Sequence, residues 1–284
     1  MNLEKEVFDI FERQLGQEVK TITDCSKGVE QIVKVVNTDV NNYVIKFPRE
    51  GKAPTSHREA FVWEKLKGRG PIPEVVLSTD EYIVQKFIDG EDLSELNLDE
   101  DLIKNVYKKL GEFLKVLHSV KMSGFGFVDK NGKGESITLK EKLDQYNRKD
   151  IVYISMHGVL KDGEILRIIK YLSKNNHLAS LSESVLLHFD FEDWNIRVKD
   201  GELSGVIDFG DLFAGPSSFE FARPFISGYE DNRFEYLLEG YGDVDKKEIE
   251  YFVVVTLLWL IRRHHRLENT VKLERDLKIL RSIV

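Results

Sequence analysis

Cysteine is almost missing from this chain of 284 residues, in which Cys25 is the only one. A single cysteine excludes an intramolecular disulfide and any metal site built from several cysteines. Long apolar runs are missing too. The longest, 251–261, is interrupted by Thr256 and is shorter than the roughly 20 residues that cross a bilayer. The first 15 residues include four acidic side chains, which predicts an amphipathic helix rather than a signal peptide. We therefore expect a cytoplasmic protein, in a reducing compartment, with no membrane partner.

An excess of basic charge is also absent. The 41 lysines and arginines are outnumbered by 49 acidic residues, which gives a net charge of −8. An acidic protein is a poor general binder of nucleic acid, so we expect no nucleic-acid partner. The same balance is compatible with a cationic small substrate. With 42% apolar residues the chain can bury a core, which excludes disorder as its main state.

Proline is missing between Glu74 and Gly215, which permits long helices in that part of the chain. The part before it is rich in β-branched and aromatic residues and predicts a small sheet with one helix. The predicted strands are 29–36, 42–48, 74–77 and 82–88, and the helix is 59–66.

After Asp89-Gly90, apolar residues recur at the three- and four-residue spacing of a helix face. Short strands return near 184–189, 195–198 and 203–209, and Asp200-Gly201 predicts a hairpin turn between the last two. We therefore predict an α+β fold of two lobes. The smaller lobe, 1–88, is β-rich, and the larger lobe, 89–284, is mainly helical.

The segment from His188 to Asn195, together with Asp208, carries the most informative side chains. Asp190 follows a predicted strand and can present its carboxylate to a substrate hydroxyl, which makes it the candidate catalytic base. Asn195 and Asp208 are expected on the two strands of the hairpin, where their oxygens converge. Oxygen ligands with room for phosphate oxygens and water suit Mg²⁺. A base together with such a metal site is the arrangement that phosphoryl transfer requires.

Lys46 lies in an otherwise apolar predicted strand, where burying a lysine is costly unless it is paired. Glu59 follows 13 residues later on the predicted helix and is the expected partner. Such a pair would hold the ammonium for the phosphates of a nucleotide. Ser26, Lys27 and Gly28, between two predicted strands, form a candidate loop over those phosphates.

These motifs together resemble the aminoglycoside phosphotransferase family, a branch of the protein-kinase-like fold. The resemblance spans roughly residues 20–225, and its details are most similar to the members that modify a 2″-hydroxyl. The matching positions are His188, Asp190 and Asn195 in H-x-D-x-x-x-x-N, residues 207–210 in I-D-F-G, Lys46 on its strand and Glu59 on its helix.

The resemblance implies a kinase that uses Mg²⁺ and either ATP or GTP, a choice that the sequence leaves open. It also implies that the connection containing Gln85 and Phe87 presents backbone hydrogen bonds to the nucleotide base. His188 is expected to brace the catalytic loop rather than to react. Glu220 stands where the family commonly has an aspartate that ties this loop to the helical lobe, so we expect a structural role for it.

Four acidic residues are candidates for binding the acceptor. Glu192 and Asp193 belong to the predicted catalytic loop, where they would either contact a cationic acceptor or cap and solvate the loop. Glu230 and Asp231 open a predicted helix that borders the acceptor site in similar enzymes, and helix capping is the alternative role for both.

The chain departs from the family pattern in three places. Phe189 stands where the family usually has glycine, and the candidate phosphate loop contains only one glycine, Gly28. Residues 262–281 are rich in basic side chains, which would repel a polycationic antibiotic if they lined its binding site.

Three functions follow from these residues. The leading hypothesis is an aminoglycoside O-phosphotransferase, an antibiotic-resistance activity. The second is a metabolite kinase with a sugar, amino alcohol or nucleoside-like acceptor. The third is a non-catalytic nucleotide-binding regulator.

Overall fold

The structure, a computed structural model, describes residues 3–25, 31–181 and 183–284. The chain divides into two compact units, each of which uses two separate stretches of sequence. The N-unit is Met1–Leu96 with Asp193–Asp211, and the C-unit is Asn97–Glu192 with Leu212–Val284. The N-unit is therefore larger than the predicted lobe 1–88. Its extra parts are residues 89–96 and residues 193–211. The second stretch contains a hairpin from far along the chain, which no single boundary in sequence order could include.

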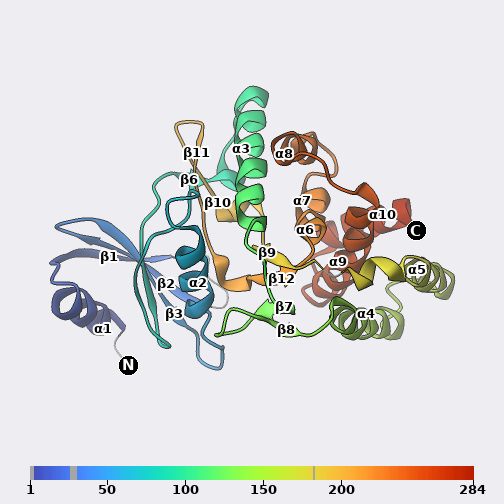
Figure 1. Ribbon diagram of the computed structural model, residues 1–284, viewed down its shortest axis with the longest axis horizontal. Helices are drawn as coiled ribbons and strands as arrows, with labels where there is room; N and C mark the ends of the chain where they lie inside the picture. The colour runs from blue at the N-terminus through green and yellow to red at the C-terminus, as the bar shows by residue number, and fades with distance from the viewer. Residues whose placement is uncertain (1–2, 26–30, 182) are drawn as a thin grey trace. The chain divides into compact units, whose positions relative to one another are not determined.

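The N-unit contains a five-stranded antiparallel sheet in the order β1-β2-β3-β5-β4, with one helix, α2, between β3 and β4 (Figure 1). The predicted strands and helix are present. The sheet also contains β1, just before residues 26–28, where the sequence implied a strand without giving its bounds. The elements are β1 (Val19–Cys25), β2 (Gln31–Thr38), β3 (Asn42–Pro48), α2 (Ser56–Leu66), β4 (Val75–Ser78) and β5 (Ile83–Lys86).

One face of this sheet is covered by the N-terminal helix α1 (Leu3–Asp9), which continues into a π-helical turn, Ile10–Gln14. The buried side chains of the helix pack on alternate residues of β2 and β3, as the two-residue period of a strand requires. Phe11 lies with its ring centroid 5.4 Å from that of Tyr43. Burial of each large apolar side chain contributes about 1.5–3 kcal/mol, so this helix stabilises the sheet that carries Lys46.

The second sheet of the N-unit has the order β11-β10-β6, with β6 at Glu91–Asp92, β10 at Ile196–Lys199 and β11 at Glu202–Val206. The predicted hairpin is present, and Asp200 at its turn has a φ of 52°. The predicted strand 203–209 is three residues too long. The chain leaves the strand after Val206 because Asp208 adopts a φ of 64°, which an extended strand cannot contain.

The C-unit is mainly helical and includes a short four-stranded sheet in the order β8-β7-β12-β9. Its strands are β7 (Phe125–Val128), β8 (Gly134–Ser136), β9 (Val185–Leu187) and β12 (Phe213–Gly215). Its helices are α3 (Glu100–His118), α4 (Leu139–Met156), α5 (Asp162–Lys174), α6 (Ser217–Glu220), α7 (Ala222–Ser227), α8 (Arg233–Tyr241), α9 (Lys246–Arg266) and α10 (Thr270–Ile283).

Helices α3 and α8 pack so closely that their contact requires glycine. A Cβ at Gly111 would lie 2.1 Å from the carbonyl oxygen of Leu237, and one at Gly240 would lie 1.9 Å from that of Lys108. The start of α3 is fixed by Asp99, whose carboxylate accepts the Leu102 N–H at 2.9 Å.

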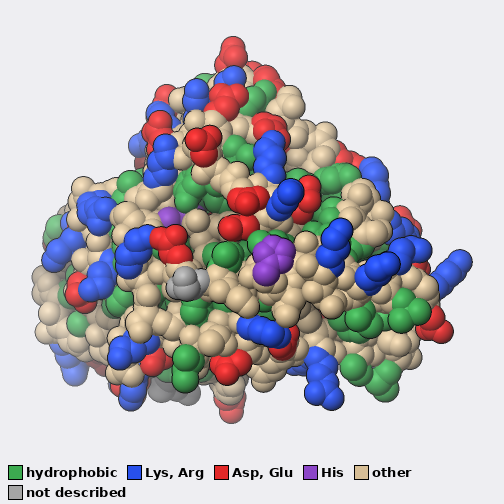
Figure 2. Space-filling model, turned by 45° about the vertical axis from the view of Figure 1, so that its right-hand side comes forward, with side chains coloured by type: hydrophobic (Ala, Val, Ile, Leu, Met, Phe, Trp, Pro, Cys, Tyr) green, Lys and Arg blue, Asp and Glu red, His purple; other side chains and the backbone are tan. Residues whose placement is uncertain are grey.

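None of the described helices combines the length and the apolar composition that a membrane span requires. On the face shown in Figure 2, basic and acidic side chains lie interspersed.

Candidate active site

In the N-unit, the predicted pair of Lys46 on β3 and Glu59 on α2 is present. Lys46 Nζ lies 2.8 Å from Glu59 Oε2, and the two residues are 8% and 0% exposed. Burial disfavours the ammonium, but the carboxylates of Glu59 and Asp208 outweigh it and raise the pKa of Lys46 above its usual range. Lys46 is therefore charged at neutral pH and is held at a fixed place on the sheet.

Asp208 extends this ion pair into a chain of three charges. Its Oδ1 lies 3.6 Å from Lys46 Nζ, and its side chain is 50% exposed. The following turn is fixed by helix α2, because Arg58 Nη1 donates to the Gly210 carbonyl at 2.7 Å. Neighbouring residues of one helix, Arg58 and Glu59, thus hold both the turn that carries Asp208 and the lysine beside it. No pattern in the sequence predicts the contact between Arg58 and Gly210, which are 152 residues apart.

The other proposed metal ligand, Asn195, is buried in a one-turn helix, Asp193–Asn195, that directly precedes β10. Asn195 and Asp208 were expected on the hairpin strands, and both in fact lie just outside them. The Asn195 carbonyl accepts the Ile207 N–H at 2.9 Å, which keeps the two segments together at the open end of the hairpin.

Amide and carboxylate oxygens are the donors that Mg²⁺ prefers, so Asn195 and Asp208 fit this ion. Among the described residues, no group of three or more His, Cys, Asp or Glu side chains could hold a metal ion.

The residues predicted to hold the rest of the nucleotide are only partly described. Ser26, Lys27 and Gly28 lie outside the described residues. Gln85 is buried within β5, between partners on β3 and β4. The N–H of Phe87 donates to the Asn42 carbonyl at 2.9 Å, so Phe87 would offer a nucleotide base its carbonyl group.

In the C-unit, Glu220 fixes the backbone beside the candidate base. Its buried carboxylate accepts the N–H of His188 at 2.6 Å and the N–H of Phe189 at 2.9 Å. This is the structural tie that the sequence predicts for Glu220. His188 is fully buried next to the Phe191 ring, at a centroid distance of 5.7 Å, and its role as a brace of the loop stays a prediction.

Phe189 adopts the left-handed conformation that glycine adopts most readily, with a φ of 69°. Its ring stacks on Phe213 at 4.2 Å and meets Phe219 edge to face at 5.1 Å. A non-glycine residue in this conformation costs about 1–2 kcal/mol, and aromatic packing offsets that cost. The unusual phenylalanine is thus accommodated by a local aromatic cluster.

We expect Phe189→Gly to be more stable than Phe189→Ala by about 1 kcal/mol, although glycine usually destabilises a protein relative to alanine. Both variants lose the ring, but only glycine also relieves the backbone strain. Both should be less stable than the wild type. Urea unfolding of the three proteins measures the order, and an alanine variant as stable as the glycine variant would contradict this explanation.

Asp190, the candidate base, forms an ion pair with Arg223 on α7. The same guanidinium lies 3.5 Å from Glu192, which is buried and not open to solvent as an acceptor contact would be. Sequence reasoning missed Arg223, because nothing in the local pattern connects it with a residue 33 positions earlier.

The remaining acceptor candidates have local partners. Asp193 opens the one-turn helix before β10. Glu230 pairs with Lys278 at 2.6 Å. Asp231 lies two residues before α8 and accepts the backbone N–H of Arg233 at 2.9 Å. The helix begins after Asn232, and not at Glu230 and Asp231 as the sequence predicted.

The basic C-terminal stretch is largely neutralised inside the C-unit. Arg262 pairs with the buried Asp150, His264 Nδ1 lies 2.7 Å from Asp276, and Arg281 pairs with Glu164 at 2.8 Å. The basic charge of this stretch is therefore no guide to the charge of the acceptor.

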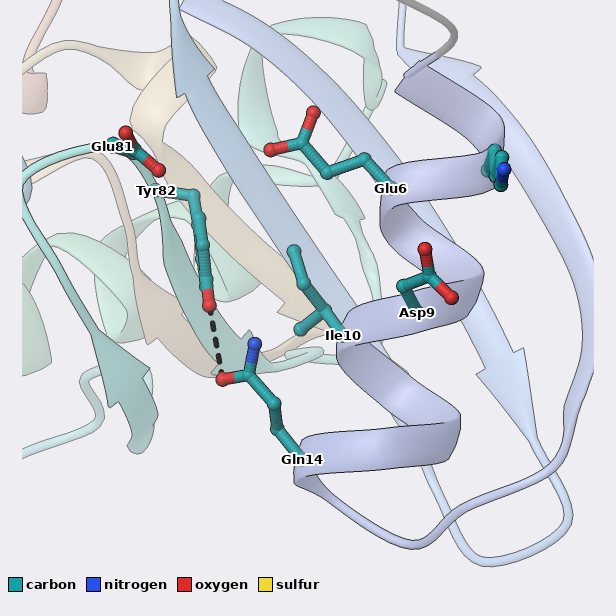
Figure 3. A pocket seen from close by; sticks show the side chains of 7 residues that line it. Glu6, Asp9, Ile10, Gln14, Glu81 and Tyr82 are labelled. Carbon is teal, nitrogen blue, oxygen red and sulfur yellow. Dashed lines mark hydrogen bonds between the residues drawn. The ribbon is translucent and has the colours of Figure 1, made fainter.

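A hollow of about 450 Å³ lies in the N-unit between the first helix and the β4–β5 turn (Figure 3). Tyr82 and Gln14 close one side of it with a hydrogen bond of 3.1 Å (Figure 3). None of the residues lining it is a predicted site residue.

The sequence profile of the phosphotransferase enzyme family matches residues 21–251. The chain belongs to this phosphotransferase enzyme family, and as a member it is an enzyme that phosphorylates hydroxyl groups. A search of curated protein sequences finds no match.

Several solved structures are similar over nearly the whole chain. One is a thermostable mutant of aminoglycoside phosphotransferase APH(4)-Ia in ternary complex with AMP-PNP and hygromycin B, with a TM-score of 0.74 and 20% identity, covering 98% of each chain. Another is the gentamicin complex of APH(2″)-IIa, with a TM-score of 0.68 and 22% identity, covering 99% of this chain and 96% of that one. The streptomycin–ATP complex of APH(2″)-IIa has a TM-score of 0.69 and 21% identity, and covers 97% of both chains.

These structures confirm the predicted α+β, protein-kinase-like fold and the predicted resemblance to aminoglycoside phosphotransferases, the 2″ group included.

Proposed function

We propose that the protein is a small-molecule kinase that transfers the γ-phosphoryl group of ATP or GTP to an acceptor hydroxyl in the presence of Mg²⁺. The observation that carries this proposal is the chain of charges Glu59–Lys46–Asp208, in which Glu59 and Lys46 are buried. A fixed cation next to a half-exposed carboxylate supports the proposal, because phosphoryl transfer needs a cation for the nucleotide phosphates and a ligand for the metal ion. We also propose a cytoplasmic location, because nucleoside triphosphates are available there.

Each residue then has a defined task. Lys46 holds phosphate oxygens of the nucleotide. Asn195 and Asp208 would hold Mg²⁺, which would neutralise charge on the transferred group. Asp190 accepts the proton of the acceptor hydroxyl, whose oxygen forms the new bond to phosphorus while the bond to the nucleoside diphosphate breaks. Glu220 holds the backbone from which Asp190 projects.

The first acceptor class is an aminoglycoside. The similar proteins are complexed with hygromycin B, gentamicin or streptomycin, and an acidic protein favours a cationic acceptor. The second candidate is a metabolite kinase with a less basic acceptor. It is favoured by Arg223, which places a positive charge beside the candidate base and opposes the approach of a polycation.

An acceptor panel distinguishes these candidates. The purified protein is incubated with MgATP or MgGTP and hygromycin B, gentamicin, streptomycin, sugars or amino alcohols, and release of nucleoside diphosphate is measured. We expect turnover with at least one aminoglycoside, lost in excess chelator and restored by Mg²⁺. Turnover only with sugars or amino alcohols would replace the first acceptor class by the second. Undiminished turnover in chelator would contradict the metal assignment.

A further inference from the structure

Arg223 makes an unusual set of contacts within the C-unit. Its Nη2 donates to Asp190 Oδ1, and its Nη1 lies 3.5 Å from Glu192 Oε1. One guanidinium group thus joins two carboxylates of the catalytic loop. Arginine is suited to this task because its planar fork presents several donors in a fixed geometry, whereas lysine offers a single point charge.

The guanidinium of Arg223 is itself held in place. Its central carbon lies 5.3 Å from the ring centroid of Trp259 on α9, and its side chain is only 16% exposed. Arg263, one turn further along α9, lies over the same ring at 5.2 Å. Trp259 therefore provides a ring against which the guanidinium of Arg223 packs.

This arrangement fixes the side chain of Asp190. The Asp190 side chain is 22% exposed, so the surrounding protein does not enclose it fully. A carboxylate held through one oxygen cannot rotate freely about its Cβ–Cγ bond, and the direction of its second oxygen is then set. A base must lie within hydrogen-bond distance of the proton that it accepts, and small misplacements are costly in rate.

We propose that Arg223 is the positioning residue for Asp190, with Glu192 and Trp259 holding Arg223 in turn. The inference rests on the proposed function, in which Asp190 is the base. The backbone of the loop is already fixed by Glu220, so Arg223 is assigned to the side chain alone. The two acidic residues that contact Arg223 then have different roles. Asp190 is oriented by Arg223 to act on the acceptor, and Glu192 serves only to hold Arg223.

The test measures kcat and KM for MgATP with whichever of hygromycin B, gentamicin and streptomycin the wild type turns over fastest. Arg223→Ala should lower kcat about 100-fold while KM for the nucleotide changes less than about twofold. Millimolar guanidinium chloride should recover part of the lost kcat of Arg223→Ala. Arg263→Ala, which removes a cation from the same indole ring, is the matched control and should retain wild-type kcat.

Glu192→Gln provides a second, milder variant that keeps the shape of the site. It should lower kcat about 10-fold by loosening Arg223, again with little change in KM. Wild-type kcat in Arg223→Ala would overturn the inference. A loss of kcat in Arg223→Ala that is matched by losses of nucleotide affinity and of folded protein, and that guanidinium does not reverse, would also overturn it. A merely structural contact gives that result. Absence of transfer by the wild type would overturn the proposed function itself, and this inference with it.

Discussion

Asp190→Asn is expected to lower the rate of phosphoryl transfer by about 100- to 10,000-fold, because an amide cannot accept the proton of the acceptor hydroxyl. Nucleotide binding should be unchanged, since Lys46 and Asp208 belong to the N-unit and do not depend on this carboxylate. The fold should also survive, because Arg223 keeps Glu192 as a partner. Steady-state kinetics and calorimetric titration with MgATP measure the two effects separately.

The matched control for this variant is Asp200→Asn. Asp200 is exposed at the turn of the hairpin and has a φ of 52°, a conformation that asparagine also tolerates. Asp200→Asn makes the same chemical change at a residue that is not a predicted site residue, so the turnover of this variant should equal that of the wild type. Normal turnover by Asp190→Asn would remove Asp190 as the base. Loss of nucleotide binding together with turnover would instead indicate damage to the fold.

Lys46→Met is expected to destabilise the protein by about 3–5 kcal/mol, because it leaves the fully buried Glu59 carboxylate without its cation. Adding Glu59→Gln should restore most of this stability, since the amide carries no charge into the interior. Transfer should remain about 100-fold below wild type in the double variant, because the cation for the phosphates is still missing. Unfolding in urea and steady-state kinetics of the two single variants and the double variant separate structure from catalysis.

An exposed ion pair in the same unit is the control for Lys46. Lys199 lies 2.7 Å from Asp89, with both side chains more than half exposed. Lys199→Met should change the free energy of unfolding by less than about 1 kcal/mol. Recovery of activity in the Lys46→Met/Glu59→Gln double variant would show that Lys46 serves only to neutralise Glu59.

The residues that could be predicted from the sequence are those whose chemistry conflicts with their surroundings. Burying Lys46 in an apolar strand is unfavourable without a buried acidic partner, and Glu59 on the following helix is that partner. The positions of Asn195 and Asp208 at one hairpin followed from the Asp200-Gly201 turn. Their placement just outside the strands did not, because it depends on the positive φ of Asp208, which no local pattern reveals.

The contacts that escaped prediction join residues far apart in the chain through ordinary-looking side chains. Arg58 and Arg223 are single arginines on helices, where solvent exposure is the usual outcome. Their roles depend on which loop packs against each helix, and only the fold determines that. The division of the chain into two units depends on the same kind of contact, because β10 pairs with a two-residue strand, β6, that is too short to be recognised in the sequence.

The fate of the γ-phosphoryl group tests the central claim most directly. The wild-type protein would be given γ-labelled ATP or GTP, Mg²⁺ and an aminoglycoside, and the label would be followed into acceptor, inorganic phosphate and protein. The account predicts that the label moves to a hydroxyl of the acceptor and that Asp190→Asn leaves it on the nucleotide. Label found only in inorganic phosphate or on the protein, or no movement with any acceptor despite bound nucleotide, would contradict a small-molecule kinase.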